Sequence, residues 1–146
     1  MVRALVLLGL LLPFAALAQE APGEVEGALT VNAYQAKRLH DLGAVFVDVR
    51  PGREWAWGHV RGALHLDFAT GLASLAGSDL PRSVPLVIYC DSEFCAAGAQ
   101  ATRMAVEWGY RQVFYLRDGY FAWQLEDFPL EKGGAADYAT FSAQAH

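Results

Sequence analysis

Runs of consecutive apolar residues constrain the fold of this chain more than any other feature of its sequence. Three such runs, at residues 44–47, 86–89 and 113–116, are rich in β-branched and aromatic side chains. A strand that is apolar at every position is typical of a sheet whose two faces are both covered. These runs therefore predict a mainly parallel sheet flanked by helices, which is an α/β fold.

Segments with helical spacing alternate with these runs. Asn32 is of a residue type that caps helices, and Ala33, Ala36 and Leu39 then fall on one helical face. Further helices are expected at residues 70–76, 96–108 and 120–125, and a short strand at residues 63–66. The alternation supports one α/β domain.

The two ends of the chain differ in character from the middle. Residues 1–18 have the order of a secretory signal peptide, with Arg3, an apolar stretch and small residues up to Ala18. An uncleaved anchor is the alternative, but the apolar run is shorter than the ~20 residues that span a bilayer. We expect an exported protein, periplasmic or secreted, without stable membrane contact after cleavage. Residues 19–28 are predicted as a flexible lead-in, 29–132 as the domain and 133–146 as a flexible tail.

Composition excludes several classes of partner. The formal net charge is −5, and Lys and Arg do not cluster. Nucleic acids and anionic membranes both require clustered cations, so we expect no nucleic-acid partner. The sequence also lacks a Gly-rich phosphate loop, an HExxH motif and a pair of CxxC motifs. It therefore predicts no cofactor and no metal.

Cys90 is the candidate nucleophile. It directly follows the apolar run at residues 86–89 and precedes a helix expected to begin at Ala96. A thiol there would lie at the carboxyl end of a strand and beside helix N–H groups, which favour the thiolate. In open parallel sheets, ligands bind at this edge. The candidate active-site loop comprises Asp91, Ser92, Glu93, Phe94 and Ala96 beside the cysteine.

Cys95 is the only other cysteine of the chain. Thiols of exported proteins tend to be oxidised, so a Cys90–Cys95 disulfide closing the loop is one alternative. The other is a resolving thiol, which attacks a sulfur species held on Cys90 and releases its cargo. The geometry of the loop decides whether the bond forms.

Three ordered segments resemble signatures of the rhodanese family of sulfurtransferases. The first comprises residues 46–50, Glu54 and residues 58–63, the second residues 87–90, and the third parts of residues 109–129. The resemblance covers roughly residues 29–132. It implies a three-layer rhodanese-like domain in which Cys90 accepts a sulfane sulfur as a persulfide and passes it to a thiophilic acceptor. The implied partners are a small sulfur donor and a thiol acceptor, and a protein thiol is one form that the acceptor could take.

The loop departs from the family pattern, which has small residues and a final arginine. Here Asp91 and Glu93 bring negative charge, and Cys95 stands in place of the arginine. A like-charge contact at ~5 Å costs roughly 1 kcal/mol in water and more in a partly dry cleft. Thiosulfate is therefore expected to be a poor donor, and phosphatase chemistry is disfavoured. Two other functions remain open: a thiol-disulfide or sulfur relay using Cys90 with Cys95, and a catalytically weak interaction module.

Four polar residues near the first signature are expected to be structural. They are Asp48, Arg50, Glu54 and His59. We expect Arg50 to pair with Glu54 and fasten the end of the strand to the following turn. His59 is interpreted as a hydrogen-bonded scaffold residue. Phe94, inside the loop, is the best candidate for contact with a substrate or partner.

Overall fold

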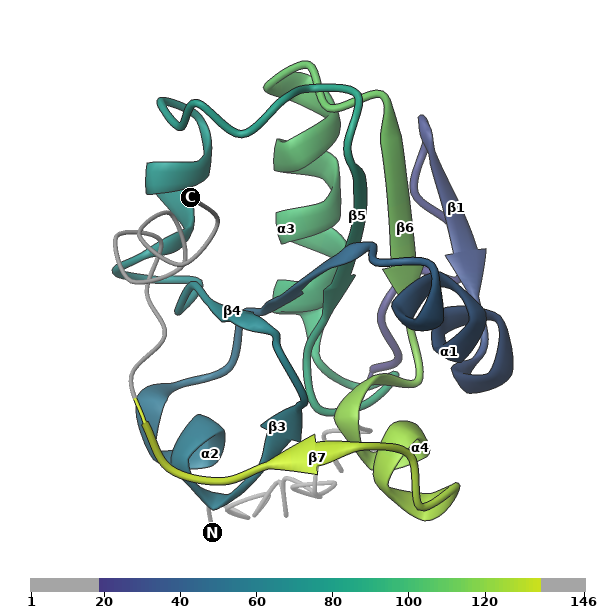
Figure 1. Ribbon diagram of the computed structural model, residues 1–146. Helices are drawn as coiled ribbons and strands as arrows, with labels where there is room; N and C mark the ends of the chain where they lie inside the picture. Colours follow the sequence, from purple (N-terminus) through teal and green to yellow (C-terminus); the bar gives the residue numbers. More distant parts are fainter. Residues whose placement is uncertain (1–18, 135–146) are drawn as a thin grey trace, which may run out of the picture.

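Five parallel strands form the central sheet of the computed structural model, which describes residues 19–134 (Figure 1). The strands are β1 (Ala28–Val31), β2 (Val45–Asp48), β4 (Leu64–His65), β5 (Pro85–Tyr89) and β6 (Gln112–Leu116). Their order is β1-β6-β5-β2-β4, and every neighbouring pair is parallel. The α/β fold class is therefore confirmed. The expected signal peptide and residues 135–146 of the expected tail lie outside the described residues.

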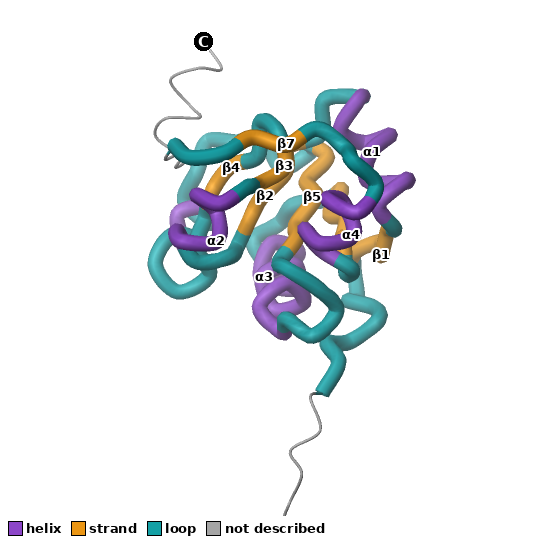
Figure 2. The backbone as a smooth tube through the Cα atoms, turned by 90° about the horizontal axis from the view of Figure 1, so that it is seen from below, coloured by secondary structure: helices purple, strands orange, loops and turns teal. Residues whose placement is uncertain are grey.

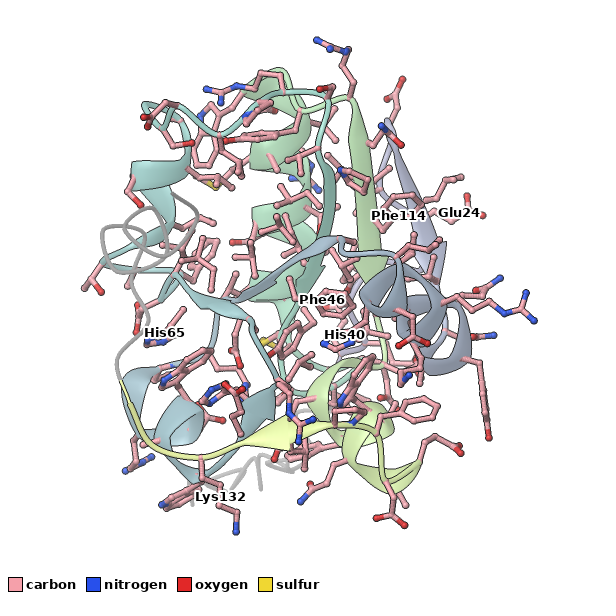
Figure 3. The ribbon with its side chains drawn as sticks, viewed as in Figure 1. Glu24, His40, Phe46, His65, Phe114 and Lys132 are labelled. Carbon is pink, nitrogen blue, oxygen red and sulfur yellow. A yellow bond between two sulfur atoms is a disulfide. The ribbon has the colours of Figure 1, made fainter. Side chains whose placement is uncertain are left out.

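Helices cover both faces of this sheet. Figure 2 shows the strands between α3 (Ala96–Glu107) on one side and α1 (Ala33–Asp41) with α4 (Gly119–Leu125) on the other. Along β2, Val47 packs on the side of α3, whereas Phe46 packs on the side of α1 and α4. In Figure 3, Phe46 and His40 lie beside each other, and their ring centroids are 5.4 Å apart. Both faces of the strand are thus buried, as its continuous apolar run predicts.

Local sequence accounts for the first helix. Asn32 caps α1 because its side chain accepts a hydrogen bond from the Gln35 N–H, at 2.9 Å. The Gln35 side chain accepts in return from the Asn32 N–H, also at 2.9 Å. This reciprocal pair is a capping box, which satisfies two backbone donors that the helix leaves unpaired.

The segment expected as a helix at residues 70–76 is instead a short 3-10 helix, η1 (Leu72–Leu75). The Asp67 carboxylate accepts hydrogen bonds from the N–H groups of Ala69 and Thr70, and the Asp67 carbonyl accepts from Gly71. These bonds hold residues 67–71 in a turn, because a side chain that bonds nearby N–H groups competes with a helix. The helix prediction was wrong for this reason.

Sequence patterns missed four short elements. They are β1, α2 (Gly52–Trp57), β3 (His59–Val60) and β7 (Leu130–Glu131). Figure 1 shows β7 crossing below the sheet beside β3, and the two pair antiparallel. Beyond β7, the Gly133 N–H donates to the Ala56 carbonyl, and the Trp55 indole donates to Gly134. The contacts of the domain thus continue past the expected boundary at residue 132.

Residues 19–28, expected as a flexible lead-in, pack against the domain. Ala21 and Val25 are buried, and Val25 lies in a cluster with Ala99 and Tyr115. The Ala21 N–H donates to the Glu93 carbonyl at 2.7 Å. The sequence did not reveal this packing because two isolated apolar residues in a polar segment give no periodic pattern. Within residues 19–134, no helix is both long and apolar enough to cross a membrane.

We predict that Val25→Ala destabilises the protein, whereas Glu24→Ala does not. Val25 is buried, and removing two buried methyl groups costs about 2 kcal/mol, as core truncations do. Glu24 is the matched control because it is the exposed neighbour in the same segment (Figure 3). Urea unfolding at pH 7 measures both changes. Equal free energies of unfolding for the two variants would show that the segment does not contribute to stability.

Candidate active site

Cys90 lies at the carboxyl edge of the sheet, directly after β5. The cysteine is 6% exposed, and Cys95 occupies the N-cap position of α3. The first N–H groups of a helix have no carbonyl partner within it, so they favour negative charge nearby. The six-residue segment between strand and helix, residues 90–95, therefore brings Cys90 close to a helix amino end, as the sequence indicates.

Cys90 and Cys95 form a disulfide in this structure. The two Cα atoms are 6.1 Å apart, within the ordinary range for such a bond. The bond closes the loop over Asp91, Ser92, Glu93 and Phe94. A disulfide sulfur has no thiol proton to lose, so a Cys90 thiolate exists only after reduction. Of the two states expected for Cys95, the structure has the disulfide that closes the loop.

Helix α4 holds this loop from one side. Its first N–H groups bond the carbonyls of the loop: Tyr120 donates to Cys90 at 2.9 Å, and Phe121 donates to Asp91 at 3.0 Å. The contact is close enough that a Cβ at Gly119 would lie 2.5 Å from the Asp91 carbonyl carbon. Gly119 also has a φ of +68°, which favours glycine. Glycine is thus required here for two independent reasons.

Helix α3 approaches the cysteine from the other side. A Cβ at Gly98 would lie 3.3 Å from Cys90 Cβ and 3.3 Å from the ring of Tyr115. Gly98 is buried in the first turn of α3. Its missing side chain lets the helix backbone pack directly beside the cysteine.

A buried carboxylate at the end of the neighbouring strand pairs with Arg50. This is Asp48, which lies in register with the residue that precedes Cys90. Arg50 Nη2 donates to Asp48 Oδ2 at 2.6 Å and to the Gly58 carbonyl at 2.7 Å. Our prediction that Arg50 pairs with Glu54 was wrong. Glu54 is only half-buried, whereas Asp48 is completely buried and needs a cation, since an unpaired buried charge is costly.

Arg50 also connects this pair to the loop. Its guanidinium carbon lies 4.1 Å from the centroid of the Tyr120 ring, and the Tyr120 N–H bonds Cys90. Burial by itself lowers the pKa of Arg50, but the hydrogen bonds and charge of Asp48 outweigh it and the pKa is raised. Arg50 therefore stays charged and 3% exposed, and it supports the site from below.

His59 joins three elements of the scaffold. Its Nδ1 lies 2.9 Å from the Trp55 carbonyl of α2, and its ring stacks on the Trp55 ring. Its Nε2 lies 3.7 Å from a carboxylate oxygen of Glu131 in β7. These contacts agree with the scaffold role that the sequence indicates.

A shallow groove of about 630 Å³ lies beside the active-site loop. Its lining residues, which we call the acidic groove, are Ser92, Glu93, Phe94, Asp118, Phe121, Ala122 and Leu125. The last four belong to α4 and its N-cap and were missed by sequence reasoning. Counted from Asp118, the other three follow after three, four and seven residues, which is the spacing of one helix face, and this pattern could have revealed them.

Three potential metal ligands also meet at the site. The ligand atoms of Cys90, Asp91 and Cys95 lie within 4.8 Å of one another. Both sulfurs are engaged in the disulfide, whereas metals bind thiolates. Any metal ligation by this set therefore requires reduction first.

Comparison with known proteins defines the class to which this fold and site belong. The sequence profile of the rhodanese-like domain matches residues 31–126, and the chain belongs to this family. The thiosulfate sulfurtransferase GlpE of Pseudomonas fluorescens is 35% identical over 97 residues, 66% of this chain and 84% of that protein. The HTH-type transcriptional regulator Rv0324 of Mycobacterium tuberculosis is 33% identical over 116 residues. That match covers 80% of this chain but only 50% of the regulator.

Solved structures show the same fold. The polysulfide-sulfur transferase homodimer of Wolinella succinogenes has a TM-score of 0.62 at 22% identity, covering 73% of this chain and 80% of that one. The Alr3790 protein of Anabaena has a TM-score of 0.62 at 24% identity, covering 70% and 92% respectively. The resemblance read from the sequence motifs is therefore confirmed for both family and fold.

We predict that Gly119→Ala is far more damaging than Gly43→Ala. Both glycines have positive φ, which costs alanine about 1 kcal/mol. At Gly43 nothing lies within 4 Å of the added Cβ, but at Gly119 the loop backbone does. Overpacking adds about 1–3 kcal/mol. The free energy of unfolding and the rate of reduction of the disulfide are the measurements. Equal losses for the two variants would contradict the close contact of α4 with the loop.

Proposed function

We propose that the reduced protein is a sulfurtransferase in which Cys90 carries a sulfane sulfur as a persulfide and passes it to a thiophilic acceptor. The observation that carries this proposal is the position of Cys90, at the carboxyl edge of the sheet and beside the amino end of α3. Membership of the rhodanese-like family and relatives named as thiosulfate sulfurtransferases support it.

Reduction is the first step of the proposed cycle. A thiolate of a reducing dithiol attacks Cys95 Sγ, the Cys90–Cys95 bond breaks, and its electron pair leaves on Cys90 as a thiolate. The second thiol of the reductant then releases Cys95 and leaves as part of an oxidised disulfide. We assign the attack to Cys95 and the leaving role to Cys90 because Cys95 is the more exposed residue of the two.

Loading and transfer follow by two displacements. The Cys90 thiolate attacks the outer sulfur of a persulfide donor, and the donor leaves as a thiolate. The acceptor thiolate then attacks the terminal sulfur of the Cys90 persulfide, and the Cys90 thiolate is regenerated. Backbone N–H groups near the α3 amino end stabilise the anionic persulfide between the two displacements.

A thiol-disulfide or sulfur relay is the second candidate, and the observed disulfide favours it. In this branch the Cys95 thiolate attacks Cys90 Sγ, the sulfur–sulfur bond of the persulfide breaks, and hydrosulfide leaves. The product is the Cys90–Cys95 disulfide found in the structure. The two branches differ in whether the terminal sulfur leaves on an acceptor or as hydrosulfide.

We predict that reduced protein gains the mass of one sulfur atom from glutathione persulfide, and gains it less readily from thiosulfate. The thiosulfate dianion meets the carboxylates of the loop, whereas the reacting group of a hydropersulfide carries at most one charge. Intact-mass spectrometry after removal of donor is the measurement. Cys90→Ser should gain no sulfur, and Cys95→Ser should load but release hydrosulfide more slowly. Absence of a Cys90-dependent sulfur with both donors would rule out the sulfurtransferase.

The acidity of the loop generates a separate prediction. Asp91→Asn combined with Glu93→Gln should raise the rate of loading from thiosulfate about 3- to 10-fold at low salt, and less at high salt, because screening weakens the repulsion. The control is Glu26→Gln combined with Glu107→Gln, which removes the same charge at the opposite end of α3 from the loop. If both double variants respond alike, net charge rather than the loop controls the reaction with thiosulfate.

A further inference from the structure

Apolar side chains are exposed together in the acidic groove. Phe94 is 52% exposed, Phe121 51% and Leu125 82%. Phe94 comes from the active-site loop, whereas the other two lie on one face of α4. Contiguous exposed apolar surface of this kind marks sites of interaction on soluble proteins.

Two carboxylates line the same groove. Within residues 19–134, neither Glu93 nor Asp118 forms a salt bridge. Arg117 interacts electrostatically with Asp118, but its guanidinium donates hydrogen bonds to the Glu20 carboxylate at 2.9 Å and the Ala21 carbonyl at 2.9 Å and none to Asp118. The groove therefore combines apolar surface with negative charge that no salt bridge neutralises, and it is complementary to a partner with the opposite charge.

The groove also borders the loop segment that carries Cys95. Phe94, which lines it, immediately precedes Cys95. Cys95 is half-buried, whereas Cys90 is 6% exposed. Of the two cysteines, Cys95 is therefore the more exposed residue and the one adjacent in sequence to the groove lining.

We propose that the acidic groove docks a segment of a partner protein that presents an apolar side chain next to Lys or Arg, close to its own cysteine. The inference rests on the proposed function and names the partner of that site. The partner's thiolate attacks Cys95 Sγ, a partner–Cys95 disulfide forms, and the Cys90–Cys95 bond breaks with its electron pair on Cys90. Docking therefore directs a reducing protein to the sulfur whose attack frees the Cys90 thiolate.

The chemistry of the groove favours a protein segment over a small anionic thiol. A small thiol makes little contact with Phe121 or Leu125, and an anionic one is repelled by Glu93 and Asp118. A groove of about 630 Å³ falls in the size range of ligand sites and accommodates side chains from a segment of chain.

Two synthetic peptides test the proposal on the oxidised protein. Each carries one cysteine and one Phe, and they differ only in two flanking residues, which are Lys in one and Glu in the other. The measurement is the second-order rate constant for opening the Cys90–Cys95 disulfide, at low and at moderate salt. We expect the Lys peptide to react roughly tenfold faster at low salt, because opposite charges steer association.

Groove variants locate the effect. Phe121→Ser combined with Leu125→Ser, and separately Asp118→Asn, should remove most of the advantage of the Lys peptide. Leu42→Ser is the matched control because Leu42 is 84% exposed at the end of α1 and outside the groove. Dithiothreitol, which carries no charge other than that of its reacting thiolate and has no apolar side chain, should open the disulfide at nearly the same rate in all variants, and this also shows that each variant is folded around the loop.

Equal rates for the two peptides, or a Lys advantage that survives in both groove variants, would overturn the proposal. Self-association of the wild type that the Phe121→Ser/Leu125→Ser variant abolishes, measured by sedimentation, would assign the groove to a second copy and also overturn it. Persulfide loading of dithiothreitol-reduced protein distinguishes failure of the groove proposal from failure of the sulfurtransferase proposal. Loading without a peptide preference rejects the groove alone, and a peptide preference without loading rejects the sulfurtransferase.

Discussion

Burial of β5 on both faces is the constraint on which the site depends. The strand lies between β2 and β6, and its residues pack alternately against the two helical layers. At the carboxyl edge of the sheet the chain leaves β5, turns through residues 90–95 and enters α3. The turn exposes carbonyls that need donors, and α4 supplies two of them. The reactive segment is thus held by backbone hydrogen bonds, which do not depend on the identity of its side chains.

The Asp48–Arg50 pair extends this support below the site. Both residues are almost fully buried, and breaking such a pair costs about 3–5 kcal/mol because one charge is left uncompensated. The pair also fixes Tyr120, the residue whose N–H bonds Cys90. A buried arginine committed to a carboxylate and a carbonyl adds little to the attraction of an anionic substrate at the surface. The electrostatics at the mouth of the site are therefore set by Asp91, Glu93 and Asp118.

The sequence predicted the parts of this structure that periodicity encodes. Continuous apolar runs located β2, β5 and β6, and the end of β5 placed Cys90. Periodicity could not reveal β3 and β7, because two-residue strands contain no repeat and form only when residues 59–60 meet residues 130–131. Arg50 was expected to pair with Glu54 and fasten the strand end to the following turn, whereas the complete burial of Asp48 makes that carboxylate the partner. The acidic groove was missed because it joins a loop to a helix more than twenty residues away.

The disulfide matters more for the reactivity of the two cysteines than for the stability of the fold. It spans a sequence separation of 5, and closing so short a loop restricts the unfolded chain by only about 2 kcal/mol, less than a long loop would. The carbonyls of the loop also accept hydrogen bonds from Ala21, Tyr120 and Phe121, and none of these bonds involves a sulfur atom. We therefore expect reduction to make the Cys90 thiolate available while the backbone contacts of the loop are kept. Cys95 is the more exposed residue of the pair and Cys90 the more buried one, so the proposed cycle assigns attack by the partner and storage of the sulfane sulfur to different cysteines.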